Sequence, residues 1–120
     1  MMSIYSEPHT ASLSEHYIQN QIREWCGNNN LLCFRCNVGR VLTADNIWFD
    51  TGLPSGFSDL LILDNNGHAI FCEVKSLTGK QRPDQKKFES VVTSRGFLYI
   101  LAHSLNEFVT IYTKNHSNHS

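Results

Sequence analysis

Hydrophobic and polar residues follow two different periods along this chain, and each change of period marks a predicted element. Apolar residues recur at helical spacing from Ile18 to Trp25. The preceding residues, Ser12 to Glu15, have the pattern of a capping box, and Gly27 follows the last apolar position. The sequence therefore predicts a first helix over residues 13–26, with one apolar side.

Short apolar runs bounded by turn residues predict strands further along the chain. Leu60 to Leu63 is apolar at every position, which is typical of a central strand covered on both faces. The run from Ala69 to Lys75 follows Asn66-Gly67, the strongest short-range signal for a β-hairpin. Other strands are predicted at residues 31–36, in a looser ribbon at 41–49, and at 97–102.

The C-terminal third predicts at least one more helix. Pro83 suits the first turn of a second helix, and Gly96 ends its apolar pattern. Ser104 to Glu107 is a second capping-box match and favours a short final helix. Phe108 to Tyr112 has the composition of a strand, so both interpretations stay open for this segment.

The predicted hairpin carries acidic residues near its open end, and its loop length decides whether they meet. With a two-residue Asn66-Gly67 loop, Asp59 opposes Val74 and Glu73 points to the other face. With a three-residue loop or one bulge, Asp59 opposes Glu73. The residues leave both registers open, but Glu73 and Lys75 share a face in either case.

Composition favours one small domain. The chain has 120 residues, of which 41% are hydrophobic, and a net charge of -1, so DNA binding would depend on a local basic patch. No apolar run is long enough for a membrane span, and the N-terminus lacks the pattern of a secretory signal. We expect a soluble, cytoplasmic protein with an N-terminal extension at 1–11 and a domain at 12–113. The polar residues 114–120, including His116 and His119, are expected to be a disordered tail.

Four cysteines raise the alternative of a zinc site. Cys33 and Cys36 have the spacing of half a zinc knuckle, but Cys26 and Cys72 are isolated. On a strand, residues three apart point to opposite faces and cannot bind one ion. We therefore expect reduced, partly buried thiols and no structural zinc.

Five short motifs occur along the chain in one order. They are Glu15 in the first helix, Arg35-x-Asn37-x-Gly39, Gly56-x-x-Asp59, Glu73-x-Lys75-Ser76, and Gln85-x-x-Phe88 in the second helix. Together they resemble the VRR-NUC family, the virus-type replication-repair nucleases of the PD-(D/E)xK superfamily. The resemblance spans residues 12–102, with Ser58 where Pro is more usual.

This resemblance implies an α/β fold with a restriction-endonuclease-like core, in which helices flank a mixed central sheet. It implies a hydrolase, a DNA endonuclease dependent on Mg²⁺ or Mn²⁺. The implied catalytic residues are Asp59, Glu73, Lys75, Gln85 and Glu15. The implied metal ligands are Asp59, Glu73, the Val74 carbonyl and Glu15, whose hard oxygens suit these cations. Lys75 would stabilise the transition state, and Gln85 would hold Lys75 or the attacking water.

Each of these residues also has a purely structural alternative. The third position of a capping box already gives Glu15 a role. Glu15 nevertheless lies on the apolar stripe of its helix, where a buried carboxylate needs a partner such as a cation beside Asp59 and Glu73. Glu73 and Lys75 could form a solvated cross-strand pair, Asp59 could be a strand-entry residue, and Gln85 could be an exposed helix residue. The residues alone leave these alternatives open.

Basic and polar side chains on two sides of the predicted site are candidates for DNA contact. They are Arg35, Asn37, Arg40 and Ser55 on one side, and Lys80, Arg82, Lys86 and Lys87 on the other. A solvated helix face is the alternative for the second group. Aromatic residues do not interleave regularly with basic ones, so we expect recognition of backbone and shape.

Stand-alone members that this chain resembles imply structure-specific cleavage of branched DNA, such as four-way Holliday junctions. This places the protein in replication, repair or recombination in a bacterial or phage-infected cell. The small size favours a homodimer with two active sites. The alternatives are a nuclease for linear duplex or single-stranded DNA, a non-catalytic nucleic-acid-binding module, and a cation-stabilised structural protein.

Overall fold

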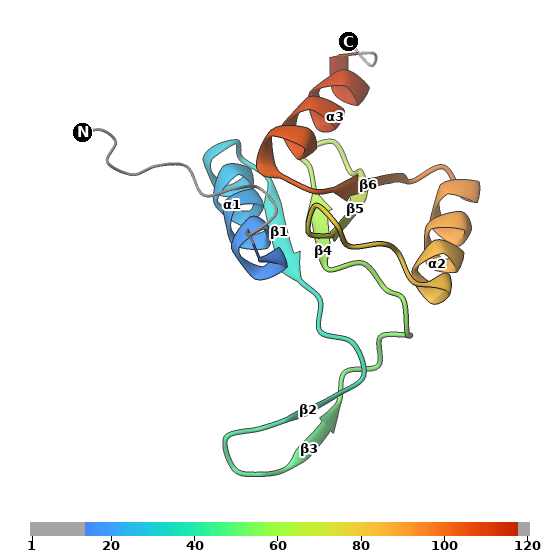
Figure 1. Cartoon of the computed structure of the whole chain (residues 1–120). Helices are drawn as coiled ribbons and strands as arrows, with labels where there is room; N and C mark the ends of the chain where they lie inside the picture. Colours follow the sequence, from blue (N-terminus) through green and yellow to red (C-terminus); the bar gives the residue numbers. More distant parts are fainter. Residues whose placement is uncertain (1–13, 118–120) are drawn as a thin grey trace.

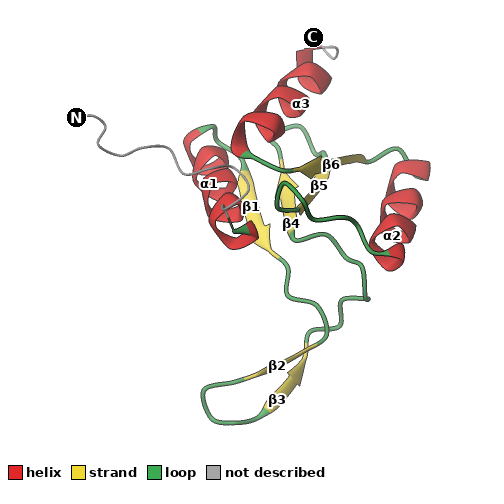
Figure 2. Ribbon diagram, viewed as in Figure 1, coloured by secondary structure: helices red, strands yellow, loops and turns green. Residues whose placement is uncertain are grey.

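Four strands form one mixed sheet in this computed structural model, which describes residues 14–117 (Figures 1 and 2). The elements are α1 (Glu15–Asn28), β1 (Leu32–Arg35), β2 (Arg40–Leu42), β3 (Trp48–Asp50), β4 (Leu60–Leu63), β5 (Ala69–Val74), α2 (Pro83–Ser94), β6 (Leu98–Ala102) and α3 (Leu105–Ser117). The sheet order is β1-β4-β5-β6, with β5 and β6 parallel and the other two pairs antiparallel. The predicted α/β fold with a mixed sheet is confirmed. The predicted extension at 1–11 and His119 lie outside the described residues.

Helices α1 and α3 pack together on one face of the sheet. Ile18 and Ile22 of α1 and Phe108 of α3 are fully buried against Leu60 and Ile62 of β4. Because alternate residues of a strand point to opposite faces, the next residues of β4 point away from this core. They are half-buried, so β4 is a central strand as predicted, but its second face is less completely covered than its first.

Helix α2 covers part of the opposite face, over β5 and β6. Phe88 of α2 contacts Phe57, Phe71 and Tyr99, with ring centroids 4.7, 5.5 and 6.4 Å away respectively. These aromatic rings form a second, smaller packed layer on this face. The layer does not extend over β1, whose side chains on this face remain exposed.

Strands β2 and β3 form a separate two-stranded hairpin that projects away from the sheet (Figure 1). It occupies the segment where the sequence predicted a looser ribbon, at 41–49. Both of its connections lead back to the same place, because the Cys36 N–H donates to the Asp59 carbonyl at 2.8 Å. The hairpin is therefore an insertion between β1 and β4, two strands that are neighbours in the sheet.

Both ends of α1 differ from the prediction, because more than one residue at each end can cap the helix. The N-cap of α1 is Ser14, whose Oγ accepts from the Tyr17 N–H at 3.0 Å, and not Ser12. At its other end α1 passes Gly27 and stops after Asn28, before Asn30 in the left-handed region with φ 63°. Both shifts occur because polar residues near the expected end of the helix can cap it equally well.

The C-terminal segment is helical to Ser117, which decides between the two interpretations left open by the sequence. The Ser104 hydroxyl accepts from the Glu107 N–H at 3.0 Å, and the Glu107 carboxylate accepts from the His103 N–H at 2.6 Å. These caps start the helix despite the β-branched residues that follow. Residues 114–117 therefore belong to α3, and the expected disordered tail is wrong for them.

Candidate active site

The register of the β4–β5 hairpin brings the two predicted acidic residues to the same end of the sheet. Leu60 pairs with Cys72, and the Asp64 N–H donates to the His68 carbonyl at 3.1 Å, which closes a three-residue loop. Continued by one residue, this register sets Asp59 opposite Glu73. Of the two registers allowed by the sequence, the structure has the one in which the carboxylates meet.

The backbone holds Asp59 directly beside β5. Its Oδ2 accepts from the Val74 N–H at 2.8 Å. Its pKa is nevertheless raised, first because burial disfavours the charged form and also because the Glu15 carboxylate is close. Asp59 is thus a fixed carboxylate in a site that already contains other negative charge.

Glu73 lies at the centre of the site, with 1% of its surface exposed. Its Oε2 accepts from Gln85 Nε2 at 2.6 Å and lies 3.6 Å from Lys75 Nζ. Its other oxygen, Oε1, is buried and has no hydrogen-bond partner within residues 14–117. Burial and the nearby Asp59 charge raise the pKa of Glu73 to about 8.

Gln85 has a different partner from the expected one. It was predicted to hold Lys75 or a water, but its amide nitrogen donates to Glu73. Its Oε1 accepts from the Arg82 N–H at 2.8 Å, which fixes the orientation of the amide and caps α2. Gln85 is buried, so the alternative of an exposed helix residue is wrong. Glu73 and Lys75 are buried as well, which excludes a solvated pair.

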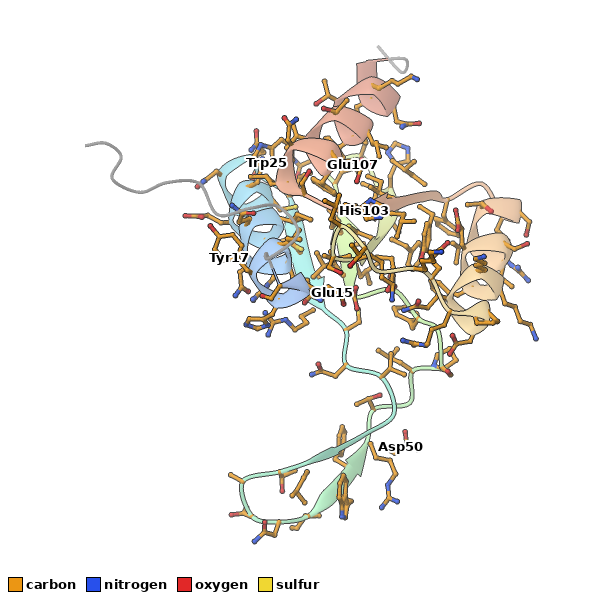
Figure 3. The ribbon with its side chains drawn as sticks, viewed as in Figure 1. Glu15, Tyr17, Trp25, Asp50, His103 and Glu107 are labelled. Atoms are coloured by element: carbon orange, nitrogen blue, oxygen red, sulfur yellow. The ribbon has the colours of Figure 1, made fainter. Side chains whose placement is uncertain are left out.

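Glu15 reaches the edge of this site from α1. It is the first residue of the helix, so it does not occupy the third position of a capping box. Its Oε2 accepts from the Ser76 N–H at 3.3 Å, and it lies on the sheet side of α1, whereas Tyr17 points away (Figure 3). Within residues 14–117 no three His, Cys, Asp or Glu side chains form a metal-binding group, so Glu15 does not complete a three-residue ligand set with Asp59 and Glu73, although its charge acts on Asp59.

Helix α2 is docked onto the loop before β4 by a close backbone approach. Gly56 has φ 88°, and a Cβ atom there would lie 2.3 Å from the Asp84 carbonyl oxygen. The Ser55 hydroxyl donates to the Asp84 carboxylate, and this bond is the first cause of the lowered pKa of Asp84. The loop therefore sets the position of Gln85, the residue after Asp84, against Glu73.

A second polar group lies near the site, and no sequence pattern predicted it. Gln81 Nε2 donates to Glu89 Oε1 at 3.1 Å and to the Tyr99 hydroxyl at 3.2 Å. Burial, and then the charge of Glu73, raise the pKa of Tyr99 above its usual range. These contacts tie the segment after Lys75 to α2 and β6. Because the three residues lie far apart in sequence, only the fold brings them together.

The predicted DNA-binding residues divide into two groups. Four already have partners: Arg35 donates to Asn20 Oδ1 at 2.7 Å, Arg40 lies 5.4 Å from the Trp48 ring centroid, Ser55 donates to Asp84, and Arg82 pairs with Asp84 at 3.3 Å. The other four, Asn37, Lys80, Lys86 and Lys87, are exposed. Within residues 14–117 the three lysines have no ion-pair partner, so they are the accessible cations of this group.

The cysteines lie in or near the core and do not contribute to the site. Cys26 and Cys72 are buried, and all four cysteines are free thiols. A hydrogen bond between the side chains of Cys26 and Cys33 raises the pKa of Cys26 and lowers that of Cys33. Burial raises the pKa of Cys36 and Cys72. The expected absence of structural zinc stays a prediction.

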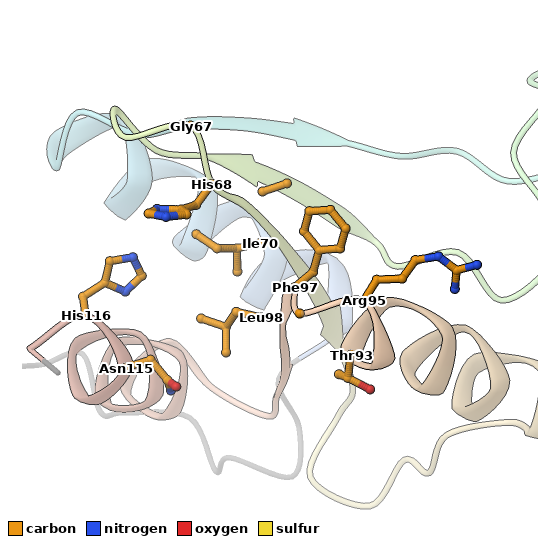
Figure 4. Close-up of a pocket in the computed structure, with 11 residues that line it drawn as sticks. Gly67, His68, Ile70, Thr93, Arg95, Phe97, Leu98, Asn115 and His116 are labelled. Carbon is orange, nitrogen blue, oxygen red and sulfur yellow. The ribbon is translucent and has the colours of Figure 1, made fainter. Parts of the chain in front are cut away.

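A cavity of about 490 Å³ lies at the other end of the β4–β5 hairpin (Figure 4). His68 and His116 line it, and both approach Asp64 Oδ2, at 2.8 and 3.7 Å. His116 also stacks on Tyr112 and so is an ordered part of α3, contrary to the prediction. Burial opposes ionisation of Asp64, but hydrogen bonds from His68 and Asn66 outweigh it and lower the pKa of Asp64 to about 2. This cavity contains none of the predicted site residues.

Fold and site together define a protein of the restriction-endonuclease-like class, in which a mixed sheet presents acidic residues at the end of adjacent strands. The sequence matches the VRR-NUC domain over residues 13–106, and the chain belongs to this family of nucleases. A solved structure described as a VRR_NUC domain has a TM-score of 0.66 and 21% sequence identity, and the match covers 82% of this chain and 94% of that one. That similarity supports the fold. No curated protein matches the sequence.

In the described part of the chain, no helix has the length and apolar character needed to cross a membrane.

Proposed function

We propose that this protein is a Mg²⁺- or Mn²⁺-dependent DNA endonuclease whose site is built on Asp59 and Glu73. The observation that carries the proposal is Glu73 Oε1, a buried carboxylate oxygen without a partner within residues 14–117. Unsatisfied buried polar atoms are rare in folded proteins and need an explanation. A cation bound beside Asp59 would satisfy this oxygen and offset the burial and the repulsion from Asp59 that together raise the pKa of Glu73.

The residues present fit a hard divalent cation. Asp59 and Glu73 supply carboxylate oxygens, and the Val74 carbonyl is the proposed third ligand, with Glu15 a further candidate at the edge. When bound, the cation would polarise the scissile phosphate and lower the pKa of a bound water. Three protein ligands leave room for water and phosphate oxygens, as catalytic sites for Mg²⁺ require.

The other residues position groups and stabilise charge. Gln85 fixes one oxygen of Glu73, so that the second is free to face the cation. Lys75 lies beside the same carboxylate, and its side chain is 9% exposed. An ammonium in such a poorly solvated position interacts strongly with charge that develops on a phosphate. We therefore assign Lys75 to stabilisation of the transition state.

The proposed substrate is branched DNA, with four-way junctions as the first candidate. Lys80, Lys86 and Lys87 form a rim next to the site, from which they would contact phosphates and not base edges. Recognition of phosphate positions is recognition of shape, which suits a branched substrate. Asn37 and Arg35 are proposed contacts on the opposite side. We also propose a homodimer and an intracellular location in a cell where this DNA is processed.

The experiment compares labelled linear, flapped and four-way DNA of one sequence in Mn²⁺, Mg²⁺ or EDTA. We expect preferential cleavage of the four-way substrate with either cation and none in EDTA. Asp59→Asn and Lys75→Ala should lower the cleavage rate at least about a hundredfold. Glu24→Gln, which alters an exposed carboxylate on α1, is the matched control and should cleave normally.

Three outcomes would contradict parts of this proposal. Binding of DNA without cleavage in either cation would favour a non-catalytic module. Equal cleavage of linear duplex would remove the branched substrate. Normal cleavage by Asp59→Asn would remove this carboxylate from the mechanism.

A further inference from the structure

A large apolar side chain, Leu77, lies at the corner of the turn that directly follows the candidate active site. The Gly79 N–H donates to the Ser76 carbonyl at 3.0 Å, which closes this tight turn. Leu77 is 53% exposed, although the corners of turns usually carry Gly, Pro, Asn, Asp or Ser. An apolar group is therefore presented to solvent two residues after Lys75.

Contacts with α1 hold this turn in one position. The Ser76 N–H donates to Glu15 Oε2 at 3.3 Å. A Cβ atom on Gly79 would lie 3.1 Å from Ser76 Oγ and 3.4 Å from Glu15 Oε2, so the turn packs closely against its neighbours. Leu77 is thus displayed by a fixed piece of backbone, and its exposure does not result from a loose loop.

Leu77 forms one wall of a cavity of about 280 Å³, here called the side pocket, which is also lined by His103, Ser104 and Glu107. These three residues come from the segment where β6 leads into α3 (Figure 3). Pockets for whole drug-sized ligands begin at about 300 Å³. The side pocket therefore has room for a single ring system.

The side pocket lies beside the candidate active site because β5 and β6 run parallel. Val74 is level with Ala102, and the Lys75 N–H donates to the Ala102 carbonyl at 3.0 Å. His103 is thus the neighbour of Lys75 at the end of the next strand, and adjacent strands are about 4.8 Å apart. Successive phosphates of one DNA strand are roughly 3.4 Å apart along the duplex. A phosphate beside Lys75 would therefore have the side pocket within one or two nucleotides.

The groups that line the side pocket favour an uncharged occupant. Glu107 Oε1 accepts from the His103 N–H at 2.6 Å and lies 2.8 Å from His103 Nδ1. With the proton on Nδ1, the other ring nitrogen of His103 has no hydrogen-bond partner within residues 14–117. The Glu107 side chain is 42% exposed, and its charge repels a phosphate. A nucleobase is flat and uncharged, and its edges carry both donors and acceptors.

We propose that the side pocket receives one unstacked base at the branch point of the DNA, with Leu77 packed against the face of the base. The inference rests on the proposed function, because this base belongs to the strand that is bound at Asp59 and Glu73. Extruding a base from a duplex costs free energy, and the cost is lowest where the base is already unpaired. Apolar side chains inserted at base steps stabilise such unstacked DNA.

The side pocket and the lysine rim act on different parts of the substrate. Lys86 and Lys87 contact phosphates, which linear and branched DNA share. The side pocket requires a base that has left the stack, and every base has a face on which a side chain can pack. Overall affinity therefore depends on the rim, whereas the preference for a branch depends on Leu77 and is independent of sequence.

The test measures DNA binding in Mg²⁺ with Asp59→Asn as the parent protein, so that the DNA stays intact and the result does not depend on turnover. Flapped and four-way DNA carry aminopurine, a base analogue that becomes more fluorescent when it is unstacked, at each nucleotide flanking the branch in turn. We expect a rise at one of these positions on binding. Addition of Leu77→Ala should abolish the rise and weaken binding about tenfold, since roughly half of this side chain is available for burial. Leu77→Met should preserve both, and Val91→Ala, at an exposed apolar position of α2, is the matched control.

Removal of the base itself gives an independent measurement. DNA with an abasic site at the responsive position should bind the parent protein about tenfold more weakly than DNA that keeps the base. The protein with Leu77→Ala should bind both DNAs alike, because the two changes remove the same contact. A parent protein that causes no rise in fluorescence, or an abasic effect that is equal with and without Leu77, would overturn the inference.

Cleavage assays in the wild-type background distinguish this inference from the proposed activity. If the wild type cleaves branched DNA and Leu77→Ala keeps the full preference over linear duplex, the side pocket is refuted and the nuclease stands. A Leu77-dependent rise in fluorescence in a protein that cleaves no DNA would support the side pocket and overturn the nuclease. Failure of every variant to bind DNA would overturn both.

Discussion

Replacement of Glu73 by Gln separates the charge of this side chain from its shape. Gln has nearly the same volume, and its carbonyl oxygen can accept the hydrogen bond that Gln85 now donates to Glu73. The change removes the negative charge beside Asp59 and the ion pair with Lys75. In the absence of metal, the effect of this substitution on the free energy of unfolding therefore measures how much the buried charge destabilises the folded protein.

The sign of the pH dependence follows from the raised pKa. Glu73 titrates at 4.5 in an unperturbed state and at about 8 in the folded protein. Its contribution to stability is thus fully present below pH 4.5 and is lost as the pH rises through 8. At about 1.4 kcal/mol per pKa unit the cost of ionisation reaches at most roughly 5 kcal/mol, and relaxation of the site reduces it to about 2 to 3 kcal/mol.

The assay is urea denaturation in EDTA at pH 5.5, 7 and 9. We expect the stability of Glu73→Gln relative to the wild type to rise by about 1 to 2 kcal/mol between pH 5.5 and 9, because part of the cost is already present at pH 5.5. Mn²⁺ at pH 9 should restore the wild type and leave the variant unchanged, because only the wild type keeps both carboxylates. Glu24→Gln should follow the wild type throughout. Parallel pH curves for Glu73→Gln and the wild type, or equal stabilisation of both by Mn²⁺, would refute the reasoning.

Three further predictions follow from the rim, the hairpin turn and the loop before β4. Replacing both Lys86 and Lys87 by Ala should weaken binding to all DNA sequences alike. It should also reduce the slope of log affinity against log salt by roughly 0.9 per lost contact. An unchanged slope would show that the two lysines do not contact DNA. The pKa of Asp64, lowered from 3.8 to about 2, contributes stability above pH 3.8 that is lost as the pH falls through 2. Asp64→Asn should thus lose about 1 to 2 kcal/mol at pH 6 and little near pH 2 in acid unfolding, and an equal loss at both would contradict this. Gly56→Ala should lower both stability and cleavage, because its Cβ would displace the start of α2. The control is Gly39→Ala, at a similar φ of 82° in open space, which should lower the free energy of unfolding by about 1 kcal/mol and leave cleavage intact. Equal effects of the two substitutions would argue against the contact between Gly56 and α2.

The sequence predicted the strands and the shared face of Glu73 and Lys75, because strand periodicity depends only on local geometry. It did not decide whether Asp59 joins them, since the register depends on the turn. In the structure, the Asp64 carboxylate accepts from the backbone N–H of Asn66 and of His68, both at 2.8 Å, and this favours the longer loop. Two serines near the start of α1 likewise left the cap, and with it the role of Glu15, undecided.

The projection of the β2–β3 hairpin and the partner of Gln85 could not be predicted from the sequence for a different reason. An apolar run predicts burial, but nothing in residues 40–50 indicates whether the covering surface belongs to the same chain. The contact between Gln85 and Glu73 depends on where α2 sits, which the approach of Asp84 to Gly56 determines. Packing between distant segments carries this information, and local patterns do not.

In strand β5, residues of the hydrophobic core alternate with residues of the candidate active site. Cys72 and Val74 are fully buried in the core shared with α1 and α3, whereas Glu73 and Lys75 face the other way into the site. Neighbouring positions thus face different selection: one set is constrained by volume and the other by charge. A drift in sequence that preserves the hydrophobic core can therefore abolish the chemistry without unfolding the protein. In such descendants the fold would persist, and within this strand the loss of activity would be visible only as substitutions at the alternate positions that face the site.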